Sequence, residues 1–213
     1  MKKITFEIFN DLFLRYPVLD ECRSDIEEAF CILKKCYSNK GKLLICGNGG
    51  SAADAEHITG ELMKGFNQKR EIPVSDANAI ISKYPSEGEW LASKLQRALP
   101  AISLSSHMAL CLAYVNDVSA EMVFAQQVYG YGQKGDVILG LSTSGNSQNI
   151  INAFKIARSM DICTLSMTGK MESRLSAVSD VSIRVPAIET YLVQELHLPV
   201  YHALCAMLET EFF

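Results

Sequence analysis

The sequence predicts an α/β fold: a three-layer αβα sandwich around a five-stranded parallel sheet, with a helical segment added at the N-terminus. Short apolar runs recur along the chain, and stretches with helical spacing separate most of them. Strands that alternate with helices imply right-handed crossovers and a parallel sheet covered on both faces. We therefore expect strands at 43–47, 101–105, 136–142, 163–168 and 181–185.

The two ends of the chain are predicted to be helical. Apolar residues at helical spacing run through about residues 1–40, as far as the turn Asn39-Lys40-Gly41. This segment has too much apolar surface to stand alone, so we expect it to pack on its own domain or on a second subunit. The last segment, 190–213, is predicted to be one long helix, whose start Pro199 should kink or delay.

Length and charge indicate one globular domain, residues 1–213, and argue against two classes of partner. A net charge of −4 gives no electrostatic reason to bind nucleic acid or an anionic membrane, and no apolar run approaches 18 residues. Acidic residues come too early for a secretion signal. The seven cysteines show no C-x-x-C spacing, so we expect free thiols in a cytoplasmic protein rather than disulfides or structural zinc.

A glycine-rich loop, Gly47-Asn48-Gly49-Gly50-Ser51, follows the first predicted strand and opens a helix. Glycines allow close backbone approach, and the first N–H groups of a helix face an anion favourably. The loop is neither a Walker A sequence nor a dinucleotide-binding G-x-G-x-x-G. Many α/β proteins carry such a turn for structural reasons, so the loop by itself leaves phosphate binding open.

A second loop, Ser142-Thr143-Ser144-Gly145-Asn146-Ser147, follows another predicted strand and also precedes a helix. Hydroxyls and backbone N–H groups bind the oxygens of a phosphate monoester without a cationic side chain. A serine or threonine before a helix usually only caps it. Four hydroxyl side chains within six residues are more than capping requires.

With these two loops the chain resembles the sugar isomerase (SIS) domain, which has a flavodoxin-like fold. Within that family it is similar to the phosphoheptose isomerases, which convert sedoheptulose 7-phosphate to D-glycero-D-manno-heptose 7-phosphate. The likeness runs from about residue 41 to the C-terminus. It implies a sugar phosphate bound by residues of both loops: Asn48, Gly49, Gly50, Ser51, Ser142, Thr143, Ser144 and Ser147.

Two pairs of residues carry the expected chemistry. His57 and Glu61 are spaced i, i+4, and Gln194 and His202 lie eight residues apart, so each pair shares one helix face. Taken alone, the first pair is typical of a helix surface and His202 of a core histidine, although such a set also suits zinc. Phosphoheptose isomerases have the same residues at all four positions. The resemblance implies that the four bind a divalent metal, that Glu61 is the base and His202 the acid of an enediol mechanism, and that Gln194 also contacts substrate.

The resemblance carries three further expectations. Asn116 and Asp117 match a pair that contacts sugar hydroxyls, although Asn-Asp is also a common turn. Family members form tetramers with active sites between subunits, so we expect a homotetramer, with a dimer as the alternative. Residues 66–100 form a longer segment than in relatives, with a helical pattern around Trp90, Leu91, Leu95 and Leu99, and could form a lid or extra subunit contacts.

Two alternatives to a sedoheptulose 7-phosphate isomerase remain open. Leu104 and Tyr191 replace aspartates of relatives and Ala52 replaces a histidine, so the substrate could be another sugar phosphate. The chain could also be a non-catalytic sugar-phosphate-binding protein like the DnaA-initiator-associating protein. That protein lacks the glutamate and the final histidine, and the presence of Glu61 and His202 therefore favours an enzyme.

Overall fold

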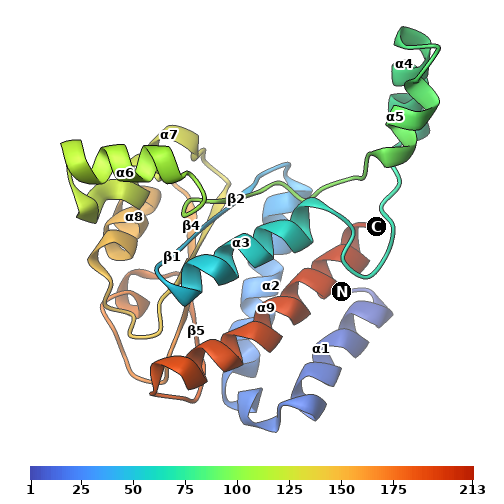
Figure 1. Cartoon of the computed structure of the whole chain (residues 1–213). Coiled ribbons are helices and arrows are strands. Elements are labelled where there is room, and N and C mark those ends of the chain that lie inside the picture. Colours follow the sequence, from blue (N-terminus) through green and yellow to red (C-terminus); the bar gives the residue numbers. More distant parts are fainter.

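The computed structural model describes residues 1–213 and confirms the three-layer α/β sandwich (Figure 1). All strands are parallel and lie in the order β2-β1-β3-β4-β5. Their bounds are β1 Leu43–Gly47, β2 Ala101–Ser103, β3 Val137–Leu141, β4 Cys163–Thr168 and β5 Val181–Arg184. From β1 the chain passes to β2 on one side, and then to β3 on the other. The connections that follow β1 and β3 therefore diverge, which opens a crevice at the carboxyl ends of these strands.

Helices cover both faces of the sheet. One face carries α1 (Lys3–Arg15), α2 (Arg23–Ser38), α3 (Gly50–Met63) and α9 (Thr190–Phe212). The other carries α6 (Met108–Asp117), α7 (Val123–Tyr131) and α8 (Gln148–Ser159). Three short 3₁₀ turns, Pro17–Cys22, Ala120–Met122 and Ser176–Val178, complete the connections. None of the helices combines the length and the hydropathy that a membrane crossing requires.

Alternating strand residues divide the interior into two cores. In β1, Leu43 and Ile45 face α9 and the N-terminal helices, whereas Leu44 and Cys46 face α7 and α8. The first core holds 34 buried residues and the second 14, so most of the hydrophobic stabilisation lies on the α9 side. The N-terminal helices belong to this larger core, since α1 packs against α9.

Helix α9 begins at Thr190 and runs through Pro199 without interruption. The expectation that Pro199 delays its start is therefore wrong. A proline inside a helix loses one backbone hydrogen bond, and burial of most of the surrounding turns offsets that cost here. The long helix matters for the site because it carries Gln194, Tyr201, His202 and Glu209 on a single rigid element.

The longer segment forms an arm of two helices, α4 (Val74–Lys83) and α5 (Gly88–Lys94), that projects away from the body (Figure 1). The two helices pack against each other, and α4 has no buried residue. An antiparallel bridge between Glu71 and Gln96 closes the base of the arm. The predicted helix is confirmed at Trp90 and Leu91 but ends at Lys94, and the expectation that it reaches as far as Leu99 is wrong. The sequence pattern also missed α4.

Candidate active site

A cavity of about 310 Å³ lies at the carboxyl ends of β1 and β3, where the strand order reverses. Its lining residues are Asn48, Gly49, Gly50, Ser51, Leu141, Ser142, Thr143, Ser144, Ser147, Thr190 and Gln194. The structure thus brings all eight loop residues of the sequence prediction into one cavity, together with Gln194. No lysine or arginine lines it. An anion bound there would be held by hydroxyls, backbone N–H groups and helix N-termini.

The first loop needs glycine for two separate reasons. Gly49 has a φ of 57°, in the left-handed region that side chains other than glycine rarely adopt. A Cβ atom on Gly50 would lie 2.6 Å from Nε2 of Gln194, so α9 approaches the N-terminus of α3 too closely for a side chain. The loop therefore brings the backbone of Gly49 and Gly50 to the cavity with the Gln194 amide beside it.

The second loop is organised by its own hydroxyl groups. The Oγ atom of Ser142 accepts a hydrogen bond from the N–H of Gly145 at 3.1 Å and lies 3.3 Å from Oγ of Ser147. The N-cap residue of α8 is Ser147, and its side chain makes no capping hydrogen bond. Capping of α8 therefore does not account for the Ser147 hydroxyl. A reciprocal pair of 3.0 Å hydrogen bonds between Asn48 and Asn149 joins the first loop to the first turn of α8.

A second group of polar side chains forms where α3 and α9 lie side by side (Figure 1). His57 Nε2 is 3.3 Å from Oε1 of Glu61, and the rings of His57 and His202 meet edge-on with centroids 4.9 Å apart. The Glu61 side chain is 14% exposed, and its other oxygen lies 3.3 Å from Nζ of Lys64. We call His57, Glu61 and His202 the catalytic cluster, after the prediction that they hold a metal and that Glu61 and His202 transfer protons.

Three other predicted site residues lie apart from this cluster. Gln194 contacts Gly50 in the cavity and is separated from His202 by eight residues of α9, about 12 Å at 1.5 Å per residue. Asn116 and Asp117 are exposed at the end of α6, where the Asn116 amide donates to the Asp117 carboxylate at 2.8 Å. This helix covers the face of the sheet opposite α3 and α9, so the pair is not part of the cavity within one chain.

The donor atoms of the catalytic cluster are of the types that bind a divalent metal. Two imidazoles and a carboxylate are ligands that zinc prefers. Nε2 of His202 is buried without a hydrogen-bond partner, and burial together with the nearby His57 lowers the pKa of His202, which favours the neutral form that binds metals. In the present side-chain arrangement, however, no three histidine, cysteine, aspartate or glutamate residues are placed to hold a metal ion. The side chains would have to rotate to converge on one.

Sequence reasoning missed Tyr201, which contacts the cluster directly, and Asp54, which reaches the cluster through Tyr201. The hydroxyl of Tyr201 donates to Oδ1 of Asp54 at 3.2 Å and lies 3.1 Å from Nδ1 of His57. Burial and the Asp54 carboxylate raise the pKa of Tyr201 well above its ordinary value, so the phenol keeps its proton. The signals in the sequence are the position of Tyr201 next to His202 and the i, i+3 spacing of Asp54 and His57.

A buried ion pair fixes the C-terminal end of α3, close to Glu61. Nε of Arg70 lies 2.8 Å from Oε1 of Glu209, and both side chains are almost fully buried. The Arg70 guanidinium donates to the carbonyls of Leu62 at 2.6 Å and Glu61 at 2.9 Å, two groups that the helix itself leaves without partners. Glu209 also accepts from the backbone N–H groups of residues 66 and 67. We call Arg70 and Glu209 the α3 clamp.

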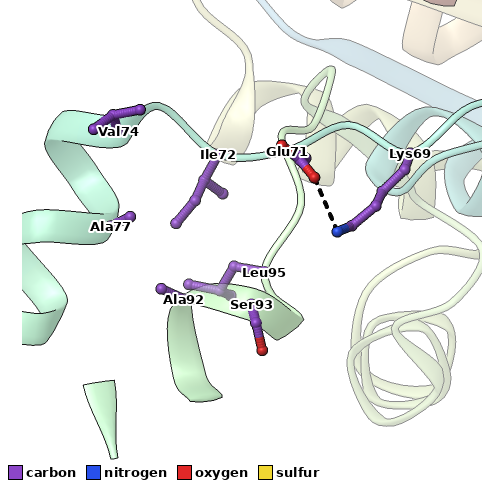
Figure 2. A pocket seen from close by; sticks show the side chains of 8 residues that line it. All are labelled: Lys69, Glu71, Ile72, Val74, Ala77, Ala92, Ser93 and Leu95. Atoms are coloured by element: carbon purple, nitrogen blue, oxygen red, sulfur yellow. Dashed lines mark hydrogen bonds and ion pairs between the residues drawn. The ribbon is translucent and has the colours of Figure 1, made fainter. Parts of the chain in front are cut away.

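Another cavity of similar size, about 320 Å³, lies at the base of the arm (Figure 2). Figure 2 shows Ile72 directed toward Ala92 between the two arm helices. Five of its eight lining residues are hydrophobic, and its only charged pair, Lys69 and Glu71, is largely exposed. It has neither a hydroxyl loop nor a cluster of buried titratable groups, so it is not a candidate for catalysis.

Comparisons with known proteins match the chain to one family. The SIS domain family matches residues 14–97 and 87–169 of the chain. Phosphoheptose isomerases from Nitratiruptor sp. and Helicobacter hepaticus are 36% and 38% identical to it, over 92% and 87% of this chain and 90% and 82% of their own lengths. Among solved structures, the phosphoheptose isomerases of Neisseria gonorrhoeae and Francisella tularensis match with TM-scores of 0.73 and 0.75, at 29% and 26% identity. These matches cover 95% and 96% of this chain and 95% and 94% of theirs.

Proposed function

The chain belongs to the SIS domain family and, within it, to the phosphoheptose isomerases, and on this premise we propose that it converts sedoheptulose 7-phosphate to D-glycero-D-manno-heptose 7-phosphate. One observation carries the proposal. The same pair of helices, α3 and α9, supplies an anion cavity without cations at one end and a carboxylate–imidazole cluster farther along. We further propose a cytoplasmic location, which the seven free cysteines support because a reducing compartment keeps thiols unpaired.

The separation of the cavity from the cluster favours a long substrate. Gly50 and Glu61 are eleven residues apart on α3, about 16 Å along the helix axis. Side chains on a helix tilt toward its N-terminus, so the Glu61 carboxylate lies somewhat closer to the cavity than its backbone does. A sugar whose phosphate and carbonyl lie at opposite ends of a seven-carbon chain suits this distance better than a triose phosphate.

Aldose–ketose isomerisation moves a proton between neighbouring carbons through an enediol. It needs a base for the carbon-bound proton, an acid for the oxygens and stabilisation of negative charge. We assign the base to Glu61, which the α3 clamp holds by its backbone carbonyl. We assign proton transfer at the oxygens to His202, whose buried Nε2 has no competing partner within the chain.

We also propose that the cluster binds one divalent metal per chain. We expect this metal to be zinc, because the cluster offers two imidazoles and a carboxylate. His57, Glu61 and His202 supply the ligands, and the fourth predicted ligand, Gln194, would have to leave Gly50 to join them. When bound, the metal supplies Lewis-acid polarisation of the sugar carbonyl. The type of donor and the unpartnered Nε2 of His202 support this site.

We propose that the protein assembles as a homotetramer. Large apolar side chains are exposed on α1, on α6 and on the arm, among them Phe6, Leu14, Leu112 and Trp90. The separation of Asn116 and Asp117 from the cavity of their own chain supports a sugar-binding site completed by a second subunit. The arm points away from the body, which favours subunit contacts over a lid.

Incubation of the purified protein with sedoheptulose 7-phosphate, with product detection by NMR, tests the reaction. We expect the aldose to form, and Glu61→Gln to lower turnover by about 10²–10⁴-fold because it removes the base while keeping the shape of the side chain. Glu56→Gln is the matched control, since Glu56 is an exposed residue on the same helix and its only side-chain hydrogen bond comes from Ser106.

The alternatives correspond to different outcomes of this assay. Faster turnover of a shorter ketose phosphate would replace the proposed substrate with another sugar phosphate. Binding of sedoheptulose 7-phosphate without turnover would contradict the isomerase and favour a sensor. Unchanged turnover in Glu61→Gln would contradict the base assignment alone.

A further inference from the structure

Tyr201 packs against both imidazoles of the catalytic cluster, and the proposed chemistry does not use it. Its side chain is 1% exposed. Its ring meets those of His57 and His202 edge-on, with centroids 5.6 and 4.9 Å apart. A phenylalanine would fill the same space, so packing explains the ring but not the hydroxyl group.

The hydrogen-bond partners of the hydroxyl decide where its proton lies. The oxygen is 3.2 Å from Oδ1 of Asp54 and 3.1 Å from Nδ1 of His57. A phenol has one proton to donate, and an ionised carboxylate only accepts. The Tyr201 proton therefore points to Asp54, and the phenol oxygen accepts a hydrogen bond from Nδ1–H of His57.

This arrangement determines which nitrogen of a neutral His57 is free. With the ring proton on Nδ1, the lone pair of Nε2 faces Oε1 of Glu61 at 3.3 Å. Two lone pairs at this separation repel each other unless a proton or a metal ion lies between them. Metal-binding histidines commonly donate their other ring N–H to a carboxylate, which orients the ring and fixes its tautomer. Here the carboxylate is Asp54, and a phenol lies between it and the imidazole.

We propose that Tyr201 is a positioning residue. Its hydroxyl donates a hydrogen bond to the Asp54 carboxylate and accepts one from Nδ1–H of His57, which keeps Nε2 of His57 free to bind a divalent cation. The inference rests on the proposed metal site. Its first consequence, the tautomer of His57, is nevertheless a property of the chain without metal and can be measured without activity.

The test compares Tyr201→Phe with a matched control, Tyr37→Phe. Tyr37 is also a buried tyrosine, on α2, but its hydroxyl has no hydrogen-bond partner. Nitrogen NMR of histidine-labelled, chelator-treated full-length protein at pH 8, where an ordinary imidazole is neutral, reads the tautomer of each ring. A His57→Gln variant assigns the signal. Competition with a chromophoric chelator then measures zinc affinity, and thermal melts verify that each variant folds cooperatively.

We expect the Nδ1–H tautomer of His57 in the wild type and in Tyr37→Phe, and a shift toward Nε2–H in Tyr201→Phe. We also expect Tyr201→Phe to bind zinc about 10–100-fold more weakly, the usual effect of losing such a partner, and Tyr37→Phe to bind it as the wild type does. An Nε2–H tautomer in the wild type, or an unchanged tautomer in Tyr201→Phe, would overturn the role of Tyr201. If the wild type binds no zinc, the proposed metal site fails, and the cation-binding part of the inference fails with it.

Discussion

Gly50 is the residue on which the shape of the anion cavity most directly depends. Its Cα faces the Gln194 amide with no room for a methyl group, because a Cβ would lie 2.6 Å from Nε2 and 3.1 Å from Oε1 of that side chain. The obstructing atoms are the end of a flexible side chain, so a substitution would displace Gln194 rather than unfold the protein.

We therefore expect Gly50→Ala to raise KM for the sugar phosphate about tenfold, the equivalent of one hydrogen bond, with little change in kcat. Gly60→Ala on the same helix is the control, since nothing lies within 4 Å of a Cβ there. It should leave KM unchanged and raise stability by up to about 1 kcal/mol through helix propensity. Equal KM values for both variants would contradict the role given to Gln194 in the cavity.

His197 is a buried histidine outside the catalytic cluster. It is fully buried, and its Nε2 lies 3.4 Å from the carbonyl oxygen of Thr168. Burial lowers the pKa of His197 to about 4, and no charged side chain contributes to this lowering. The imidazole is therefore neutral in the folded protein across the physiological pH range.

The lowered pKa predicts a loss of stability in acid. The unfolded chain takes up this proton near pH 6.5 and the folded protein only near pH 4, so protons favour unfolding between these values. The free energy of unfolding should fall by about 3 kcal/mol as the pH drops from 7 to 4, because each pH unit between the two pKa values contributes about 1.4 kcal/mol. His197→Gln keeps a donor for Thr168 and cannot titrate. Urea unfolding at several pH values should show a shallower slope for it, and equal slopes would contradict the assignment.

The α3 clamp joins the end of one helix to another. Arg70 satisfies the carbonyl groups at the end of α3, Glu209 on α9 neutralises it, and the ring of Phe213 lies 4.8 Å from the guanidinium carbon of Arg70. A buried pair of this kind is weak evidence for net stabilisation, but removing one partner leaves a buried charge without compensation.

Glu209→Gln should lower the free energy of unfolding by about 3–5 kcal/mol, the usual effect of breaking a buried ion pair. Glu71→Gln is the matched control, because Glu71 pairs with Lys69 at 3.1 Å but the two side chains are 76% and 64% exposed. Its effect should stay below about 1 kcal/mol. Similar losses in urea unfolding for both variants would show that the clamp does not stabilise this part of the fold.

The whole molecule has an arm that its own body does not cover. Helices α4 and α5 pack against each other, and exposed apolar residues such as Val74, Tyr84 and Trp90 surround them. A two-helix hairpin with so little buried surface is marginal by itself, because short helices take most of their stability from tertiary packing. Contact with another subunit would supply that packing.

We expect the wild type to sediment as a tetramer of about 94 kDa, four chains of 23.5 kDa, at micromolar concentration. Replacing residues 74–95 with a short Gly-Ser linker should leave the monomer fold intact, because the Glu71–Gln96 bridge already holds the two ends together. The assembly should then dissociate to smaller species. A wild type that sediments only as a monomer would contradict the tetramer. A deletion variant that stays tetrameric would show that the arm is not part of the subunit interface.

Local patterns in the sequence were sufficient to predict the strands of the sheet and the residues of each of the two loops. Strands β1 and β4 lie where the apolar runs predict them, and β2, β3 and β5 differ only at their ends. Alternation of strands and helices, glycines before a helix and the i, i+4 spacing of His57 and Glu61 are all short-range properties, which a reader of the sequence can see directly. Helix α4 was missed although Val74, Ala77, Ile80 and Ile81 recur at helical spacing, and none of its residues is buried in the folded chain.

The tertiary structure alone decided what those residues meet. Contact between α3 and α9 joins positions about 140 residues apart, and its register places Gln194 at Gly50, Tyr201 at His57 and Glu209 at the end of α3. It also separates Gln194 from the catalytic cluster, although the spacing along α9 had grouped it with His202. Which faces of two distant helices meet depends on how the whole core packs. No local pattern encodes that contact, and for this reason Tyr201 and the α3 clamp became visible only in the folded chain.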